Sequence, residues 1–569
     1  MNPIVRIRNV VFTYKNRSLP TLSHINLDIE QGDFVLLTGA TGCGKSSLLK
    51  MLNGLIPHEN GGLLTGEVFI EGYNTQDYSI AQLSQMVGMV FQSPDDQIFS
   101  TTVFDEVAFI LENMGIQLED IACRVHETLR LVGMFDQLDA SVHALSGGQK
   151  QRLAVASVLA ARPKVLVLDE PISQLDPQGA TELLSVLEYI NKKLGMTIII
   201  VEHRLHEVMP LCRRVVIMDK GQIVWAGTRD EAFCCPEIFD IHGLRIPQTI
   251  DICRCLGVTV RSAEVKDAVL AIQRQYKLPI SEVGAESFPG ESLVDRTPAI
   301  EIDQLEFQYE NKGRSILQDI HLAIPTGQFV ALMGNNGAGK STLLHQISGL
   351  LKPVKGQVRI GGEQVNGIRP NVGMVLQNPD FMLFNDTVAE EIAFTLRFKK
   401  TEDASSQHCQ ELLKKLGLEG MESDFPLALS RGQRLRVAIA AVLACQPLIV
   451  LLDEPTTGQD IGHIEDIILV LKEYTARGGT VIFCTHDTEV AARFAERIII
   501  MCNGSIIADG TAGTVFRQKS VLDAAGLKPP AALLIAQELY QGESVTVKEV
   551  VDYVRQKCVG SNAGVYDNP

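Results

Sequence analysis

The 569-residue chain lacks any apolar run long enough to cross a membrane. Its most membrane-like stretch, residues 437–452, is interrupted by the glutamine and proline at 446–447, whereas a membrane-spanning helix needs about 20 apolar residues. The similar stretch at 153–168 carries Arg162 and Lys164 at the matching break. We therefore expect a helix, a turn and a buried strand in both places, and no transmembrane segment.

The chain also lacks an excess of basic charge. It contains 51 Lys and Arg against 68 Asp and Glu, which gives a formal net charge of -17. A polyanion is attracted to a positive surface, so this balance disfavours nucleic acid as the main partner.

The sequence offers neither a secretion signal nor a disulfide framework. Its first residues have charges too early and apolar runs too short for a signal peptide, so we expect a cytosolic protein. The 12 cysteines lie mostly in apolar stretches, which predicts buried free thiols.

What the chain does contain is a long internal repeat. The stretch that begins at Phe12 matches the one that begins at Phe307, and the match continues to the helical segments that follow each copy. A chain of this length is expected to form three or four units. We predict a first catalytic domain at 1–235, its helical appendix at 236–276, a linker at 277–298, a second catalytic domain at 299–517, its appendix at 518–558 and a disordered tail at 559–569.

Each copy carries a glycine-rich phosphate-binding loop, "GATGCGKSS" at 39–47 and "GNNGAGKST" at 334–342. An apolar run precedes each loop and a helical run follows it, which is the strand, loop and helix order that such a loop requires. Backbone N–H groups would point at the phosphates, and the lysine would reach the β- and γ-phosphates. The serine after the lysine, Ser46 or Ser341, would ligate Mg²⁺. The predicted phosphate-binding residues are Gly39, Gly42, Gly44, Lys45, Ser46 and Ser47 in the first copy and Gly334, Gly337, Gly339, Lys340, Ser341 and Thr342 in the second.

Two apolar runs, 165–171 and 449–455, contain an aspartate followed by a glutamate. Unbroken apolar runs are typical of strands that are covered on both faces, and their C-terminal ends would open onto the nucleotide. The aspartates, Asp169 and Asp453, would orient Mg²⁺. The glutamates are placed to polarise the attacking water as general bases. These glutamates are Glu170 and Glu454.

Two further motifs, "LSGGQKQR" at 145–152 and "LSRGQRLR" at 429–436, each begin a predicted helix with a serine at the N-cap. Together with the phosphate loops and the Asp-Glu pairs, they resemble the ATP-binding cassette (ABC) family over nearly the whole chain. The resemblance implies an α/β fold with two P-loop domains. Each would have a RecA-like mixed sheet core, a helical signature subdomain and a short C-terminal helical appendix.

The resemblance implies ATP hydrolysis with ATP and Mg²⁺ as cofactors, and it assigns roles to further residues. The signature residues would close over the ATP that the opposite domain holds: Ser146, Gly147, Gly148 and Gln149, with Ser430, Arg431, Gly432 and Gln433. The glutamines that sense Mg²⁺ and the membrane partner are Gln92 and Gln377. The histidines that contact the γ-phosphate are His203 and His486. The aromatic residues that stack on adenine are Tyr14 and Tyr309. The interface aspartates, in loops that depart from the usual pattern, are Asp176 and Asp460.

Three features indicate the kind of cassette protein. Segments 90–109 and 375–394 resemble the glutamine-loop segment of energy-coupling factor (ECF) importers. The appendices resemble the C-terminal helical region through which those ATPases contact each other. Residues 245–298 hold seven basic and seven acidic side chains, whereas a ribosome-acting twin cassette would need a basic connector.

We therefore expect the ATPase subunit of an ECF-type importer for a micronutrient, a vitamin or a transition metal ion. Its partners would be a transmembrane scaffold subunit and a substrate-binding membrane subunit, at the cytoplasmic face of the membrane. Two alternatives stay open: a conventional ABC importer with two permease subunits, and a soluble ATPase that acts on ribosomes or DNA.

Acidic residues beside the two glutamines suggest where a membrane subunit would dock. Asp95, Asp96 and Asp380 could receive an arginine from a coupling helix, or they could merely cap the following helix. The arginine at Arg431, where the first copy has Gly147, would add positive charge near one nucleotide. Since both copies keep the glutamate and the histidine, we predict two competent but unequal sites.

Overall fold

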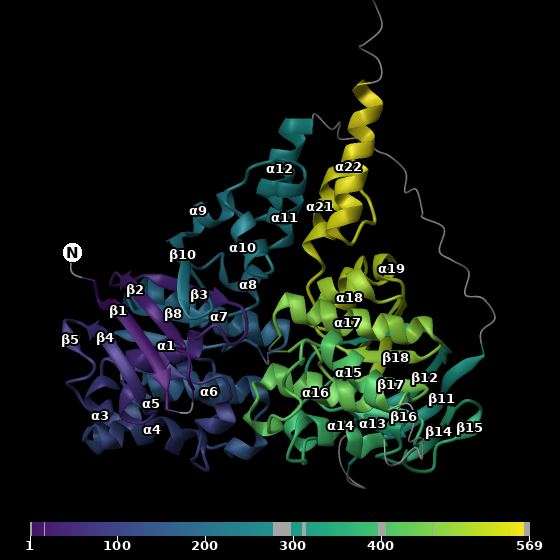
Figure 1. Cartoon of the computed structure of the whole chain (residues 1–569), viewed down its shortest axis with the longest axis horizontal. Helices are drawn as coiled ribbons and strands as arrows, with labels where there is room; N and C mark the ends of the chain where they lie inside the picture. The colour runs from purple at the N-terminus through teal and green to yellow at the C-terminus, as the bar shows by residue number, and fades with distance from the viewer. Residues whose placement is uncertain are drawn as a thin grey trace, which may run out of the picture. The chain divides into compact units, whose positions relative to one another are not determined.

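The chain forms two compact units in the computed structural model, and each repeats the same architecture (Figure 1). The structure describes residues 3–15, 17–173, 175–276, 297–309, 315–396, 405–457 and 459–562. Unit 1 contains Met1–Pro247 with Arg261–Ala263, and unit 2 contains Gln248–Val260 with Glu264–Pro569.

Unit 1 contains an antiparallel sheet and a larger, mostly parallel sheet. The antiparallel sheet has the order β2-β1-β4-β5, with β1 Val5–Tyr14, β2 Leu22–Ile29, β4 Gly62–Ile70 and β5 Tyr73–Asn74. The six-stranded sheet has the order β10-β9-β3-β8-β7-β6, with β3 Phe34–Gly39, β6 Val87–Val90, β7 Val165–Asp169, β8 Thr197–Val201, β9 Arg214–Asp219 and β10 Gln222–Thr228. Only β10 runs antiparallel to its neighbour. Every residue of β3, β7 and β8 is buried, which explains their unbroken apolar sequences.

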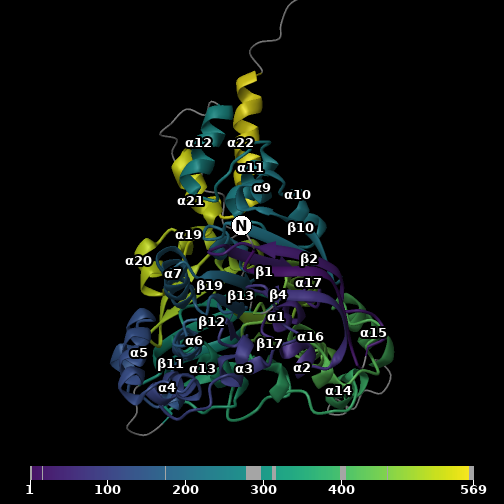
Figure 2. The ribbon, with the colours of Figure 1, turned by 90° about the vertical axis from the view of Figure 1, so that its left-hand side faces the viewer.

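The helices of unit 1 flank the larger sheet or form a separate helical layer (Figure 2). They are α1 Lys45–Leu52, α2 Leu55–His58, α3 Ile80–Leu83, α4 Val103–Asn113, α5 Leu118–Leu131, α6 Gly147–Leu159, α7 Pro177–Leu194, α8 Leu205–Val208, α9 Arg229–Cys234 and α10 Glu237–Ile241, with the 3₁₀ turns η1 Pro94–Asp96, η2 Phe135–Gln137 and η3 Val142–Ala144. Local sequence sets the ends of α7. Asp176 caps its first turn, Pro177 is its first residue, and Gly195 ends it at a φ of 66°.

Unit 2 repeats both sheets in the same strand order. Its antiparallel sheet is β12-β11-β14-β15, with β11 Pro298–Phe307, β12 Leu317–Pro325, β14 Lys355–Ile360 and β15 Glu363–Gln364. Its larger sheet is β16-β17-β18-β13-β19-β20, with β13 Phe329–Met333, β16 Val372–Val375, β17 Ile449–Leu452, β18 Thr480–Cys484, β19 Arg497–Cys502 and β20 Ser505–Gly510. Its helices and 3₁₀ turns are α13 Lys340–Ser348, η4 Pro379–Phe381, α14 Val388–Leu396, α15 Ser405–Lys415, η5 Pro426–Ala428, α16 Arg431–Ala444, α17 Ile461–Ala476, α18 Thr488–Phe494, α19 Ala512–Phe516, α20 Lys519–Ala524, α21 Ala531–Tyr540 and α22 Val547–Asn562. The prediction of two α/β domains with mixed sheets is confirmed.

Helices from the two appendices pack together within unit 2. They are α11 Gln248–Cys255 and α12 Val265–Tyr276, which contact α21 and α22. Both views of the ribbon show these teal and yellow helices side by side. The Gln248 Oε1 accepts a hydrogen bond from the backbone N–H of Ala532 at 2.9 Å, and Arg555 donates to the Cys255 carbonyl at 2.6 Å. We call this group the four-helix cluster.

The four-helix cluster changes the expected boundaries. The predicted first appendix, 236–276, is divided, because α10 belongs to unit 1 whereas α11 and α12 belong to unit 2. Helix α22 ends at Asn562 and not at 558, and the rest of the predicted tail lies outside the described residues. Most of the predicted linker also lies outside them, and Pro298 is already part of β11.

Two expectations about side chains and membrane spans can be compared with the structure. Among the residues whose side chains the structure describes, eleven cysteines are free thiols, and four of these are buried: Cys43, Cys212, Cys253 and Cys484. The expectation of burial is wrong for the exposed ones, Cys123, Cys234 and Cys235, because α5 turns Cys123 toward solvent and the other two lie at the exposed end of α9. Among the described helices, none is long and apolar enough to cross a membrane.

Candidate nucleotide-binding sites

The phosphate loop of unit 1 joins β3 to α1, as predicted. The loop can make this turn because Gly39 and Gly44 have φ values of 155° and 105°, and a Cβ on Gly39 would lie 2.1 Å from the Met218 carbonyl. The Lys45 Nζ donates hydrogen bonds to the carbonyls of Gly39 and Ala40 at 2.7 and 3.0 Å. The lysine is therefore held at the centre of the loop, where a phosphate would meet it.

Unit 2 builds the same loop between β13 and α13. The Lys340 Nζ donates to the carbonyls of Gly334 and Asn335 at 2.7 and 3.1 Å. In each unit a tyrosine hydroxyl also bonds to the last residue of the loop. Tyr14 lies 2.9 Å from the Ser47 hydroxyl, and Tyr309 lies 3.2 Å from the Thr342 hydroxyl. Both predicted aromatic residues thus lie beside the phosphate loops.

The buried aspartate of each Asp-Glu pair lies beside the hydroxyl of the phosphate loop. Asp169 ends β7 and is hydrogen-bonded to Ser46, while Asp453 follows β17 and is hydrogen-bonded to Ser341. Burial, reinforced by the negative charge of Glu170, raises the pKa of Asp169 to about 6. Burial also raises the pKa of Asp453. A carboxylate and a hydroxyl are hard oxygen donors, so each pair fits Mg²⁺ beside bound phosphate.

In unit 1 the predicted general base touches both of its predicted neighbours. Gln92 donates to the Glu170 Oε2 at 2.7 Å, and the His203 Nε2 lies 3.3 Å from the Glu170 Oε1. Burial favours the neutral form of Glu170, but the hydrogen bond and charge of His203 outweigh it and lower the pKa of this carboxyl. The carboxylate form needed to accept a proton from water is therefore the stable one.

Unit 2 assembles the base and the histidine but not the glutamine. The His486 Nδ1 lies 3.1 Å from Glu454, whereas Gln377 is exposed to solvent. Both glutamates have a positive φ, 49° for Glu170 and 52° for Glu454. This left-handed backbone is uncommon for a non-glycine residue and turns each glutamate away from the direction of its strand.

Each signature motif begins a helix through the predicted serine cap. Ser146 accepts a hydrogen bond from the N–H of Gln149, whose side chain bonds back to the serine N–H, and Ser430 makes the same capping box with Gln433. A Cβ at Gly147 would meet no atom within 4 Å. The third position of the motif can therefore carry a side chain, which explains how Arg431 is accommodated as the first residue of α16.

Two of the three aspartates that were predicted to dock a membrane subunit form ion pairs that the sequence did not suggest. Asp95 forms an ion pair with Lys150 at 2.6 Å, and Asp380 forms the equivalent pair with Arg434 at 2.7 Å. These pairs tie the glutamine-loop segment to the signature helix in both units. The alternative role as caps of the following helix is not seen in unit 1, where Thr102 caps α4. Asp96 is exposed.

Two buried glutamates beside these segments were missed by sequence reasoning. The Glu106 carboxylate accepts hydrogen bonds from the N–H groups of Phe99 and Ser100 at 3.2 and 2.9 Å. Glu391 accepts from Phe384 and Asn385, both at 2.9 Å. The sequence feature that could have identified them is that both copies of the repeat carry a glutamate at this position.

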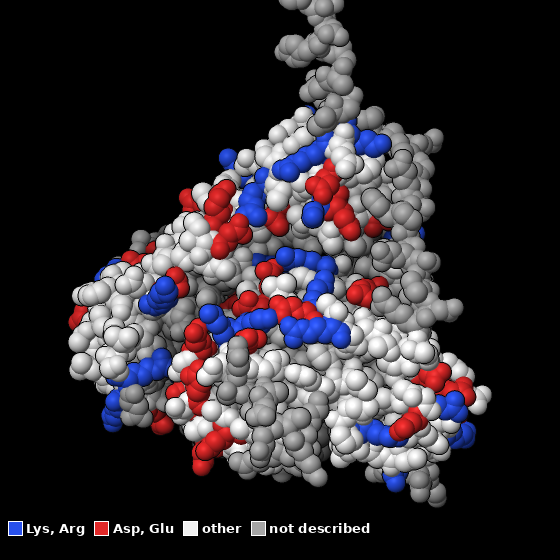
Figure 3. Space-filling view, turned by 45° about the vertical axis from the view of Figure 1, so that its right-hand side comes forward, with Lys and Arg blue, Asp and Glu red and all other residues white. Residues whose placement is uncertain are grey.

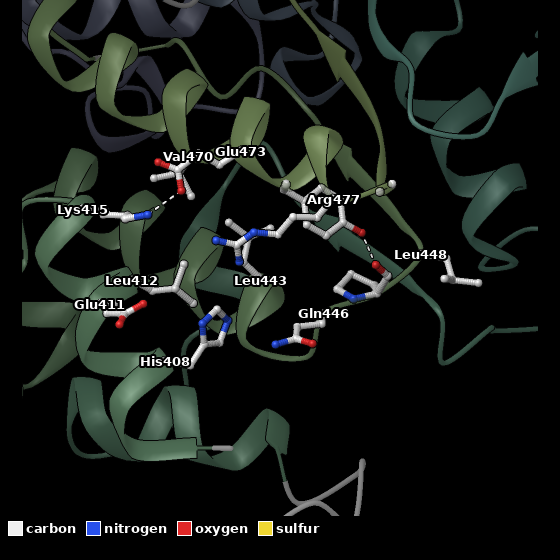
Figure 4. Close-up of a pocket in the computed structure, with 14 residues that line it drawn as sticks. His408, Glu411, Leu412, Lys415, Leu443, Gln446, Leu448, Val470, Glu473 and Arg477 are labelled. Atoms are coloured by element: carbon white, nitrogen blue, oxygen red, sulfur yellow. Dashed lines mark hydrogen bonds and ion pairs between the residues drawn. The ribbon is translucent and has the colours of Figure 1, made fainter. Parts of the chain in front are cut away.

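One cavity in unit 2 lies apart from the phosphate loop. It measures about 290 Å³ and lies among α15, α16 and α17. Figure 4 shows Leu412 and Leu443 among its apolar lining residues, His408 and Arg477 among its polar ones, and the ion pair between Lys415 and Glu473 at one side. Its lining includes none of the predicted nucleotide-binding residues, so we assign it no part in ATP hydrolysis.

The fold and these sites define a P-loop nucleoside triphosphatase with two sites in one chain. The sequence profile of the ABC transporter family matches residues 22–173 and 317–457. The chain is 43% identical over 96% of its length to an ABC transporter ATP-binding protein of Methanosarcina mazei, of which 96% is covered. It is 41% identical over 97% of its length to a similarly named protein of Methanosarcina acetivorans, of which 91% is covered.

The chain therefore belongs to the ABC transporter family and is a tandem ATP-binding ATPase. A solved structure, that of cbiO1 from Clostridium perfringens, described as part of the ABC transporter complex cbiONQ, is 33% identical in sequence. It covers 45% of this chain and 100% of its own chain, with a TM-score of 0.39.

Proposed function

We propose that the protein energises an ECF-type importer of a vitamin or a transition metal ion through two ATP sites. Its partners in this proposal are a transmembrane scaffold subunit and a substrate-binding membrane subunit at the cytoplasmic face of the membrane. The observation that carries the membrane assignment is an exposed aromatic residue at the same place in each unit, beside the glutamine-loop segment.

These aromatic residues are Phe99 and Phe384, whose side chains are 63% and 65% exposed. Each packs edge-on against a second phenylalanine, Phe109 or Phe394, with ring centroids 4.4 and 4.9 Å apart. Large apolar side chains that are exposed to solvent at the equivalent position of both units indicate a surface that a partner covers. The buried glutamates described above hold these two loops in shape, so the surface is built in advance.

The hydrolytic chemistry follows from the contacts of unit 1. Lys45 would neutralise charge on the β- and γ-phosphates, and Glu170 would align and polarise the attacking water. His203, at hydrogen-bond distance from Glu170, would hold that carboxylate and balance charge on the γ-phosphate. A bound Mg²⁺ would supply charge neutralisation on the phosphate oxygens, with Ser46 and Asp169 as its protein-side partners. The equivalent residues of unit 2 would act in the same way.

We further propose that the two halves pair head to tail, as the family motifs imply. The signature motif at 429–433 would then complete the site of Lys45, and the one at 145–149 would complete the site of Lys340. Arg431 makes the first of these sites more positive, so the two sites would be unequal.

The two alternatives differ in their expected partners. A conventional importer ATPase would bind two permease subunits instead of a scaffold and a substrate-binding subunit. A soluble ATPase would bind ribosomes or DNA. Ribosomes and DNA are polyanions, which bind to strongly basic surfaces. The net charge of -17 and the mixture of acidic and basic side chains on the face in Figure 3 therefore disfavour both of them as partners.

Purification of the native complex from membranes tests the proposal. We expect the wild-type chain to be recovered with a scaffold and a substrate-binding membrane protein, and the double variant Phe99→Ser with Phe384→Ser to lose both while it still binds ATP. Tyr189→Ser is the matched control, because Tyr189 is a 50% exposed aromatic residue on α7. Recovery of the wild type with ribosomes or DNA, or unchanged recovery of membrane subunits by the double variant, would contradict the proposal.

A further inference from the structure

The residues on either side of the site histidine differ between the two units. In unit 1, Glu202 and Arg204 flank His203, whereas in unit 2 the flanking residues are Thr485 and Asp487. The glutamate and the arginine are not used by the hydrolytic chemistry described above. Both nevertheless contact the loop that follows the general base.

Arg204 joins the histidine turn to that loop. Its Nη1 donates hydrogen bonds to the carbonyls of Ile172 and Leu175, both at 2.9 Å, and its Nη2 is paired with Glu207. A guanidinium can hold several acceptors at once because its donors lie in a fixed plane. The arginine side chain is 20% exposed, so these bonds are shielded from water over most of their surface.

Glu202 holds the same loop from the other side. Its side chain is buried, and its Oε1 accepts a hydrogen bond from the N–H of Ile172 at 2.8 Å. Its Oε2 lies 3.3 Å from the N–H of His203. Both backbone polar groups of Ile172 are therefore bound by the two neighbours of the histidine. We call this arrangement the Ile172 clamp.

Unit 2 replaces the clamp with shorter side chains. The Thr485 hydroxyl lies 3.2 Å from that of Thr456, which occupies the place of Ile172 in the repeat, and it accepts a hydrogen bond from the N–H of Asp487. The Asp487 carboxylate accepts hydrogen bonds from two N–H groups at the start of α18. A carboxylate cannot donate to a carbonyl, so Asp487 cannot hold the loop as Arg204 does.

We propose that Arg204, together with Glu202, is a positioning residue of the first ATP site. The clamp fixes Ile172 and Leu175, which follow Glu170 in the chain, to the turn that carries His203. Since Glu170 and His203 lie at the two ends of this connection, the clamp keeps their contact in place when ATP reacts. The inference rests on the proposed roles of these two residues. In the second site the corresponding connection is the contact between the hydroxyls of Thr485 and Thr456.

The test separates positioning from ATP binding. The effect of Arg204→Ala on ATP hydrolysis is measured in the wild-type chain and in a chain that carries Glu454→Gln. The second background lacks the general base of the second site, so its remaining hydrolysis comes from the first site. We expect kcat for ATP hydrolysis to fall by about 10- to 100-fold on Glu454→Gln while KM changes by less than about twofold, because Arg204 touches neither the phosphate loop nor Tyr14. Arg204→Lys, which can still donate to one carbonyl, should recover part of the loss.

The matched control is Arg214→Ala. Arg214 also donates to a backbone carbonyl, that of Asp28 at 2.6 Å, and its side chain is 27% exposed, but it lies at the start of β9 away from the site. It should leave kcat unchanged. The inference is overturned if Arg204→Ala keeps its kcat within about twofold in both backgrounds, or if Arg214→Ala lowers kcat equally. A failure of the hydrolytic roles proposed for Glu170 and His203 looks different, because Glu170→Gln would then be fully active. A failure of the proposed transport function would appear in the purification experiment and would leave this comparison of kcat unchanged.

Discussion

Replacement of Glu202 by glutamine should make the stability of unit 1 less dependent on pH. Glu202 is 1% exposed, and burial raises its pKa from an ordinary 4.5 to about 8. The charge of Glu170 adds to this rise, whereas Arg204 and the N–H groups of Ile172 and His203 oppose it. The carboxyl is therefore protonated in the folded state over a pH range in which it is ionised in the unfolded chain.

The sign and size of the effect follow from this difference. Because the folded state binds the extra proton between about pH 4.5 and 8, its free energy of unfolding falls as the pH rises through that range. Between pH 6 and pH 8.5 the loss from Glu202 amounts to about 2.5 kcal/mol, since one pKa difference of 1 corresponds to about 1.4 kcal/mol. For a unit of this size that corresponds to about 5–10 °C in Tm.

Thermal unfolding of Glu202→Gln and wild type at pH 6 and pH 8.5 measures the effect. The compared quantity is the Tm of the variant minus the Tm of wild type at each pH. We expect this difference to be about 5–10 °C larger at pH 8.5 than at pH 6, and a constant offset from the amide cancels in the comparison. Glu119→Gln, an exposed carboxyl on α5, is the control and should show no such change. A difference that is the same at both pH values would refute a buried, proton-binding Glu202.

Four further outcomes are expected. Glu170→Gln and Glu454→Gln should each lower steady-state ATP hydrolysis by the share that its site contributes, because each removes one general base, and full activity in either would contradict two competent sites. The raised pKa of Asp169 leaves this carboxyl protonated below about pH 6, so Mg²⁺-dependent ATP binding at the first site should weaken by about tenfold per pH unit below that value. In binding titrations Asp169→Asn should bind weakly at every pH and should not show this pH dependence. Leu533→Ala, at a fully buried position of α21, should cost about 2–5 kcal/mol in the unfolding of unit 2, and an unchanged Tm would show that the four-helix cluster adds little. Gly147→Arg should fold with an unchanged Tm because a Cβ meets no atom there, and a lower Tm would refute that.

Motifs with a local physical cause were predictable from the sequence. The phosphate loops, the capped signature helices and the buried strands before Asp169 and Asp453 depend on residues that are close along the chain. The contacts of Asp95 with Lys150 and of Arg204 with Ile172 join segments that are far apart in sequence. Such contacts depend on the packing of whole elements, and no local pattern specifies them.

The same reason explains the divided first appendix. The apolar faces of α11 and α12 are visible in the sequence, but the sequence alone does not say which neighbours cover them. The structure places them on α21 and α22, so residues next to each other in the chain, such as Pro247 and Gln248, belong to different units.

The four-helix cluster also bears on why the two unequal halves are made as one polypeptide. If the chain were cut after residue 276, the first product would keep α11 and α12 while the second kept the helices that cover them. Each fragment would expose an apolar face, and their association would then depend on concentration and could produce pairs of identical halves. A single polypeptide supplies one copy of each half to every molecule, so translation itself fixes the stoichiometry.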